Sequence, residues 1–321
     1  MTRLFGHEDA WREWHSAQKG SRMHHAWILS GLEGLGKATF AMQAAAEYVS
    51  VPGVSQPESD AHPDINVLER LPATEDDAKR QAEGKPFATK RSIAVDQVRQ
   101  MQRRLTTRPT LGPRRALVID SADDLEKSAV NALLKSLEEP PEGTVFLLVA
   151  HRIGRLLPTV RSRCRILRFH PLGPADLERV VDGAMPGIEP RERKAALAFS
   201  GGSPGAAIAF AEHDLGKVHD VFERLATHGD ADFSQRALLS SALGQRPSRD
   251  RQLAAIEAAR MVLVERLREA DEATRLRIGD AHAALVRLGA QATTYNFDAS
   301  LLLLEIGGLL ASVGRSREGA R

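Results

Sequence analysis

The chain has 321 residues, of which 42% are hydrophobic and 27% are charged, and its formal net charge is only +2. This length favours two or three domains, and the small net charge excludes a chain-wide polybasic signature for nucleic acid. No apolar run approaches the roughly 18 to 20 residues that a membrane span needs, and the N-terminal MTRLFGHEDAWREW carries no apolar signal core. We therefore expect a cytoplasmic protein without membrane contact.

Up to about residue 170 the chain alternates between two apolar patterns. Runs of four or five apolar residues predict short buried strands, and apolar residues at helical spacing predict helices between them. The expected elements are a helix within 1–22, a strand at 26–29, a helix at 38–49, a strand at 65–68, a helix at 93–105, a strand at 116–119, a helix at 128–139 and a strand at 145–149. Residues 72–90 are polar, charged and aperiodic, so we expect a mobile loop there. The alternation predicts an α/β domain with a parallel sheet covered on both faces.

Beyond residue 170 the strand signal disappears. A small helical unit is expected first, with breaks at Pro186-Gly187 and at Gly201-Gly202-Ser203-Pro204-Gly205. Leucine and alanine then recur at helical spacing to the end of the chain. We therefore predict an α/β domain at 1–170, a helical lid at 171–212 and an all-helical domain at 213–321.

A glycine-rich turn joins the first expected strand to the helix that follows it. It reads Gly31-Leu-Glu-Gly34-Leu-Gly36-Lys37. In a phosphate-binding loop, glycines let backbone N–H groups turn toward the phosphates, the helix N-terminus adds a positive dipole end, and the lysine reaches the outer phosphates. The three glycines, the lysine and the strand–helix context together predict a nucleotide site.

This site lacks groups that ATP hydrolysis requires. The residue after the lysine normally carries a hydroxyl that ligates Mg²⁺, and here it is Ala38. Asp120 ends a buried strand and fits the metal-facing carboxylate, but it is followed by Ser121, where hydrolysing AAA+ ATPases usually have a glutamate that polarises water. We expect a degenerate site that can hold ATP or ADP without hydrolysing it.

The single cysteine, Cys164, excludes an intrachain disulfide and a multi-thiolate zinc site. We interpret Cys164 as a small buried residue rather than a reactive thiol. The adjacent His24 and His25 point in different directions on any regular element, so they predict no metal site. The sequence therefore leads us to expect no metal and no zinc.

Three segments resemble the bacterial clamp-loader family of AAA+ proteins. They are His24-His25-Ala26 running into the phosphate loop, Asn131-Ala-Leu-Leu-Lys-Ser-Leu-Glu-Glu-Pro-Pro141, and Ser162-Arg163-Cys164. The resemblance covers residues 1–212 and fades beyond them, where only the helical pattern and Asn296-Phe-Asp298 are familiar. Residues 50–68 contain no cysteine, so the four-cysteine zinc module of many family members is missing.

The resemblance implies roles for two further positions. In that family the arginine of Ser-Arg-Cys reaches the ATP held by a neighbouring subunit, where a guanidinium stabilises charge on the transferred phosphoryl group. By resemblance, Arg163 takes this role in trans. The family's sensor 2 arginine, which touches the subunit's own ATP, is replaced here by Gly205. A degenerate site combined with a retained trans arginine is similar to the delta-prime subunits of DNA polymerase III.

The resemblance also implies an assembly. The lid would follow a P-loop AAA+ domain, and the last domain would form a helical collar with other subunits. The implied partners are gamma/tau and delta subunits, with the sliding clamp and primer–template DNA reached through the assembly. The chain would belong to the polymerase holoenzyme but would itself be neither a polymerase nor an active ATPase.

Two alternatives remain open. A gamma/tau-like motor ATPase would need Thr39 and Asp123 to replace the missing groups. A DNA-binding module would use an arginine strip that otherwise is a solvated helix face. The arginine strip consists of Arg99, Arg103, Arg104, Arg108, Arg114 and Arg115.

Overall fold

The computed structural model describes residues 4–20, 23–244, 247–292 and 297–314. The chain forms two compact units, Met1–Leu172 and Gly173–Arg321. Asn296 and residues 315–321, which the sequence pattern placed in the helical region, lie outside the described residues. The separation of the second unit into a lid and a collar stays a prediction.

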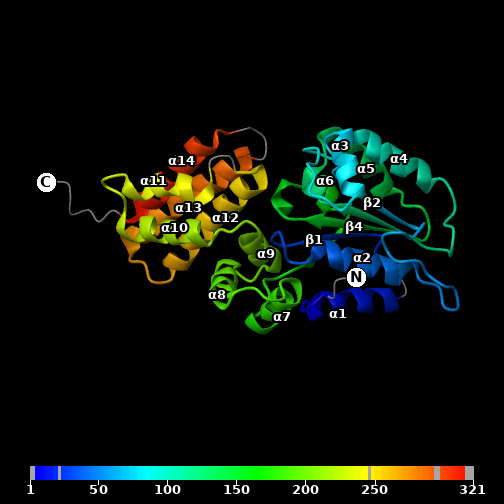
Figure 1. The fold of residues 1–321 in the computed structure, drawn as a ribbon. Helices are drawn as coiled ribbons and strands as arrows, with labels where there is room; N and C mark the ends of the chain where they lie inside the picture. Colours follow the sequence, from blue (N-terminus) through cyan, green and yellow to red (C-terminus); the bar gives the residue numbers. More distant parts are fainter. Residues whose placement is uncertain (1–3, 21–22, 245–246, 293–296, 315–321) are drawn as a thin grey trace. The chain divides into compact units, whose positions relative to one another are not determined.

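The first unit is built on a five-stranded parallel sheet in the order β2-β3-β4-β1-β5 (Figure 1). The expected α/β fold is thereby confirmed. The strands are β1 (Ala26–Ser30), β2 (Ile65–Glu69), β3 (Arg115–Asp120), β4 (Thr144–Ala150) and β5 (Arg165–Arg168). The short β5 was not expected because its sequence, Arg-Ile-Leu-Arg, is half charged. It becomes a strand by pairing along β1, with Trp27 opposite Arg165 and Ser30 opposite Arg168.

Helices cover both faces of this sheet (Figure 1). Trp14 and Phe40 are fully buried against one face, and Val98 and Leu133 are fully buried against the other. The first face is covered by α1 (Glu8–Lys19) and α2 (Lys37–Val49), and the second by α4 (Val95–Leu105), α5 (Lys127–Glu138) and α6 (Pro158–Arg161). The helix α3 (Glu75–Ala82) lies outside both cores. The 3-10 turns η1 (Ala122–Asp124) and η2 (Ile153–Arg155) follow β3 and β4. Both faces of every central strand are therefore covered, as the apolar runs predict.

The expectation of a loop without regular structure at 72–90 is wrong. The helix α3 lies inside this segment, and the Thr74 side chain caps it by accepting a hydrogen bond from the backbone N–H of Asp77 at 3.1 Å. An antiparallel bridge between Pro72 and Thr89 closes the segment at its base. None of the residues of α3 is buried, so the helix had no apolar period to reveal it; capping and first-turn acidic residues stabilise it instead.

The second unit is helical throughout the part that the structure describes. Its helices are α7 (Pro174–Ala184), α8 (Pro190–Phe199), α9 (Pro204–Glu212), α10 (Gly216–His228), α11 (Ser234–Leu243), α12 (Arg249–Leu267), α13 (Glu272–Ala292) and α14 (Ala299–Gly314). Within it, α12 packs along α13, and α10 packs along α14. Among the described residues, no helix combines the length and the apolar character needed to span a membrane.

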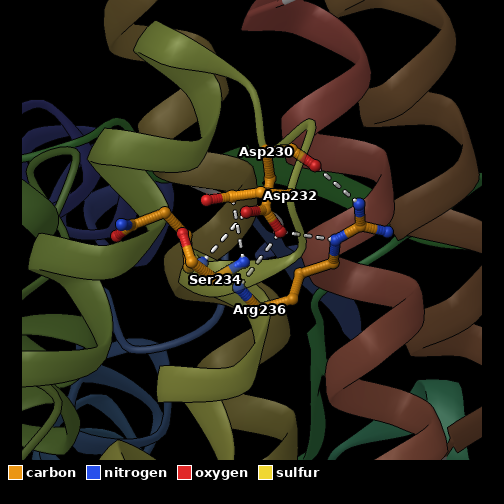
Figure 2. Close-up of polar contacts among 5 residues, drawn as sticks. Asp230, Asp232, Ser234 and Arg236 are labelled. Carbon is orange, nitrogen blue, oxygen red and sulfur yellow. Dashed lines mark hydrogen bonds and ion pairs between the residues drawn. The ribbon is translucent and has the colours of Figure 1, made fainter.

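A buried ion pair closes the turn between α10 and α11 (Figure 2). The carboxylate of Asp230 accepts hydrogen bonds from the backbone N–H groups of Gln235 (2.9 Å) and Arg236 (3.1 Å) and from Arg236 Nε (2.7 Å). The side chain of Asp230 is fully buried and that of Arg236 is 13% exposed. Asp230 thus accepts hydrogen bonds from free amides at the start of α11 and also neutralises the charge of Arg236.

Candidate phosphate-binding site

The glycine-rich turn lies between β1 and α2, where the sequence predicts it. Gly34 and Gly36 have positive φ angles of 76° and 82°, a backbone conformation that favours glycine, and Gly36 is the N-cap of α2. Gly31 has a different constraint, because a Cβ there would lie 2.5 Å from the carbonyl oxygen of Phe169. The backbone shape and the packing of this turn therefore require all three predicted glycines.

The segment before α1 lies against this turn. The ring nitrogen Nε2 of His7 donates a hydrogen bond to the carbonyl oxygen of Leu35 at 2.8 Å. A Cβ at Gly36 would lie 2.7 Å from Cδ1 of Leu4, so this leucine packs directly on the turn. The N-terminal segment therefore supports the loop from outside the strand–helix connection.

Lys37 is the first residue of α2 and is only 2% exposed. Its Nζ donates hydrogen bonds to the carbonyl oxygens of Gly31, at 2.8 Å, and of Leu32. Burial lowers the pKa of Lys37 to about 8, against the opposing charges of Glu33, Asp120 and Asp123. The cation is thus held inside the loop and has acidic groups near it.

Asp120 and His151 stand at the ends of the adjacent strands β3 and β4. Burial raises the pKa of Asp120, while His151 and Lys37 oppose that rise. Burial and the charge of Lys37 lower the pKa of His151, so its imidazole is held neutral. The structure therefore brings Lys37, Asp120 and His151 together at the carboxyl edge of the sheet.

His151 is a site residue that sequence reasoning missed. It directly follows the buried strand β4, just as Asp120 ends β3, and that position was the available signal. Among the described residues, its buried ring nitrogen Nδ1 has no hydrogen-bond partner. A buried ring nitrogen without a partner is able to bind a polar group of a ligand at this edge.

The carboxylate of Asp123 is hydrogen-bonded to backbone N–H groups. Its carboxylate accepts hydrogen bonds from the N–H groups of His151 (2.6 Å) and Arg152 (2.9 Å), and the hydroxyl of Ser121 lies 3.4 Å from it. These contacts tie η1 to the end of β4. A carboxylate held in this way is poorly placed to act as the water-polarising base that a motor ATPase would need.

The residues at this edge favour the binding of an anion, but they do not supply the groups that ATP hydrolysis needs. The N-terminus of α2, the turned amides of the glycine loop and Lys37 all favour negative charge. Ala38 offers no oxygen to Mg²⁺, and Ser121 offers no carboxylate to a water molecule. The residues present could hold the phosphates of a nucleotide but lack two groups of a hydrolytic centre.

Arg163 lies at the surface just after α6. It donates a hydrogen bond from Nη1 to the carbonyl oxygen of Thr159 at 2.8 Å and forms an ion pair with Glu138 at 2.6 Å. Its side chain is 34% exposed, so the guanidinium is both oriented and accessible. Burial raises the pKa of the neighbouring Cys164 to about 12, which agrees with an unreactive packed thiol.

Gly205 belongs to the second unit. It lies in the first turn of α9, where the Ser203 hydroxyl accepts a hydrogen bond from the N–H of Ala206 at 3.3 Å. The helix begins with Pro204 at a position that favours proline. Gly205 therefore stands at a helix start and has no side chain with which to contact a ligand.

The arginine strip is not one continuous solvated face. Arg115 is only 5% exposed and donates to the carbonyl oxygens of Arg104 (2.6 Å) and Thr107 (2.9 Å). Arg104 donates in turn to the side chain of Asn66, and Arg114 donates to the backbone of Tyr48. Arg99 pairs with Asp96 at 3.2 Å, so four of the six arginines have contacts within the described residues. This leaves a smaller surface for DNA phosphates than the sequence suggests.

The chain is similar to known proteins in both sequence and fold. Residues 6–173 match the family described as DNA polymerase III, delta subunit. The chain is 33% identical over 208 residues to the DNA polymerase III subunit delta' of Pseudomonas aeruginosa and 30% identical over 213 residues to that of Escherichia coli strain K12. These matches cover 60% and 62% of this chain but only 58% of each relative.

A likeness among solved structures extends over nearly the whole chain. A DNA polymerase III gamma subunit-related protein from Thermotoga maritima has a TM-score of 0.51 and 16% sequence identity. The comparison covers 95% of this chain and 99% of that one. At this identity the likeness supports the fold alone.

Proposed function

Because the chain belongs to the DNA polymerase III delta-prime family of AAA+ clamp-loader proteins, we propose that it is a clamp-loader subunit which activates a neighbour without hydrolysing ATP. Its partners in this proposal are gamma/tau and delta subunits in the cytoplasm. The sliding clamp and primer–template DNA are reached through that assembly. Within it, this chain scaffolds the complex and supplies Arg163 to the ATP of the adjacent subunit.

The proposal rests on one observation: the loop has the backbone shape of a phosphate-binding loop, but the site lacks the side chains that hydrolyse ATP. Lys37 and the glycines of the turn are in place, whereas the position after the lysine is Ala38 and the position after Asp120 is Ser121. The rival motor reading would use Asp123, and that carboxylate already accepts two backbone hydrogen bonds. The geometry therefore favours a subunit that does not turn over ATP.

Arg163 has the properties that a trans arginine needs. It is accessible, it is anchored by the carbonyl of Thr159, and its charge partner Glu138 is half exposed. An exposed ion pair of this kind contributes only about 0–1 kcal/mol, so exchanging Glu138 for a phosphate costs little. Known arginine fingers accelerate phosphoryl transfer by roughly 10³ to 10⁵, which is far more than the exchange costs.

The first test measures ATP turnover by the reconstituted clamp loader. We expect no turnover from this chain alone. In the assembly, Arg163→Ala should slow the one site that depends on it by about 10³-fold, and Arg163→Lys should rescue little because lysine lacks the bidentate fork. Arg168→Ala is the matched control, since Arg168 is an exposed arginine of the neighbouring strand β5.

Two outcomes would contradict the proposal. Robust turnover by the isolated chain would make it a motor ATPase. Equal single-turnover rates for the Arg163→Ala and Arg168→Ala assemblies would remove the trans role. Assembly of each variant is checked by size-exclusion chromatography, so that loss of the complex is not mistaken for loss of the arginine.

Nucleotide binding without hydrolysis forms a separate part of the proposal. We expect the isolated chain to bind ATP or ADP through Lys37 and the loop amides, and Lys37→Ala to weaken binding at least tenfold, the equivalent of about 1.4 kcal/mol. Binding of a fluorescent ADP analogue measures this directly. Unchanged affinity in Lys37→Ala would show that the loop does not hold the phosphates.

A further inference from the structure

A cluster of possible metal ligands lies in the second unit, which does not contain the phosphate loop. His219 and Glu223 are on α10 and Glu265 is on α12. One ligand atom from each of the three side chains lies within 4.8 Å of the other two. The first two are four residues apart, so they share one face of α10, and the packing of α12 against α10 supplies the third.

His219 is the unusual member of this cluster. It is only 8% exposed, so its imidazole is largely enclosed by the surrounding helices. Its ring packs edge-on against Phe199 and Phe210, with centroids 6.5 and 5.8 Å away. The aromatic rings pack against the imidazole, and one of its ring nitrogens lies within 4.8 Å of a carboxylate oxygen of each glutamate.

The charges around the cluster are not balanced. The carboxylates of Glu223 and Glu265 lie beside His219, and Arg268 is a cation close to Glu265. None of the ion pairs among the described residues includes Glu223 or Glu265. A bound cation would neutralise both carboxylates and would also bind the buried imidazole.

We propose that His219, Glu223 and Glu265 bind a divalent transition-metal ion of the zinc class, which cross-links α10 to α12. Imidazole nitrogen and carboxylate oxygen are common zinc ligands, at roughly 2.0–2.2 Å. Tetrahedral ligands at that distance are about 3.4 Å apart, so a pair at the 4.8 Å limit must approach by about 1.4 Å. Glu223 is exposed and unpaired, and a change of its rotamer can supply this movement.

Three protein ligands leave one position to water, as in open zinc sites. The ion would link two helices that are distant in sequence, so its binding would stabilise the helical unit. The earlier expectation of no metal rested on the lack of cysteines and on the His24-His25 pair. It did not consider a site assembled by helix packing, and this proposal revises it.

The proposal is tested on the full chain after chelator treatment. Calorimetric titration with Zn²⁺ should show one saturable equivalent, and Co²⁺ should give the visible absorption of a four-coordinate site. Glu223→Gln, Glu265→Gln and His219→Gln should each lower Zn²⁺ affinity by more than about tenfold, since even loss of an outer-shell partner costs 10- to 100-fold. His228→Gln is the matched control, because His228 is an exposed histidine on the same helix.

Each outcome decides the matter. Zn²⁺ affinity that is lost in the three ligand variants and kept in His228→Gln supports the site. Glu223→Gln keeps the test valid if His219→Gln fails to fold, because Glu223 is exposed. Absence of a saturable equivalent, or equal affinity in Glu223→Gln and His228→Gln, would overturn the proposal.

Discussion

The Asp230–Arg236 pair offers a sharp test of what stabilises the helical unit. Replacing Asp230 with alanine removes the acceptor of two backbone amides and of one guanidinium nitrogen (Figure 2). It leaves Arg236 with a side chain that is only 13% exposed, and Gly307 lies so close that a Cβ there would be 2.6 Å from Cγ of Arg236. The arginine is therefore hindered from moving into water.

The magnitude follows from that burial. Removing one partner of a buried ion pair costs about 3–5 kcal/mol, and partial exposure of Arg236 places the expected loss near 3 kcal/mol. The double variant Asp230→Ala/Arg236→Met should recover part of this loss, because no unpaired buried charge remains. Asp232→Ala is the matched control, since Asp232 is exposed and accepts hydrogen bonds from the N–H of Ser234, at 3.1 Å, and from the side chain of the same serine. We expect it to change stability much less.

The loss should depend on pH. Burial by itself would raise the pKa of Asp230, but the hydrogen bonds from Arg236 and from two backbone amides outweigh burial and hold the pKa below its ordinary value of 3.8. A carboxyl whose pKa is lower in the folded chain stabilises it above the unfolded value, and this contribution disappears as the pH falls through the folded value. The difference in unfolding free energy between the parent chain and Asp230→Ala should therefore shrink below about pH 4.

Urea unfolding at pH 7 and at pH 3 measures the effect. All three tryptophans, at positions 11, 14 and 27, lie in the first unit, so their fluorescence reports the sheet and far-ultraviolet circular dichroism reports both units. Asp230→Ala should lower the urea midpoint of the second unit, which is seen by circular dichroism, and should leave the fluorescence midpoint of the first unit unchanged. A loss below about 1 kcal/mol, or a loss of equal size at both pH values, would refute this account of the ion pair.

Two further predictions concern the first unit. Gly31→Ala should lower the free energy of unfolding by about 1–3 kcal/mol, because its Cβ would lie 2.5 Å from the backbone oxygen of Phe169. The control is Gly154→Ala, because a Cβ at Gly154 would have nothing within 4 Å. Equal thermal unfolding midpoints for the two variants would contradict the packing argument. Arg115→Ala should cost about 1.5–3 kcal/mol, since this buried arginine loses two charge-assisted hydrogen bonds, to the carbonyl oxygens of Arg104 and Thr107. Arg108→Ala should leave stability unchanged, and salt-dependent DNA binding by the isolated chain that is lost in Arg108→Ala would revive the DNA-binding alternative.

Much of the phosphate loop could be predicted from the sequence because its determinants are local. A strand, three glycines, a lysine and a helix follow one another within a short stretch, and the lack of a hydroxyl at Ala38 is visible without coordinates. The buried strands were also predictable, since central strands of a parallel sheet are apolar throughout. The helix α3 was missed because it buries nothing, and β5 was missed because only its pairing with β1 makes it a strand.

The contacts between distant residues required the tertiary structure. His151 was missed because it meets Lys37 and Asp120 only when β3 and β4 lie side by side. Likewise, the sequence does not show that Asp123 is held by the end of β4, that Arg163 pairs with Glu138, or that Glu265 faces His219. Backbone conformation and apolar periodicity depend on residues that are close in the chain, so the sequence by itself determined them. Charges and hydrogen bonds at a site depend on which elements pack together, and the tertiary structure alone decided that.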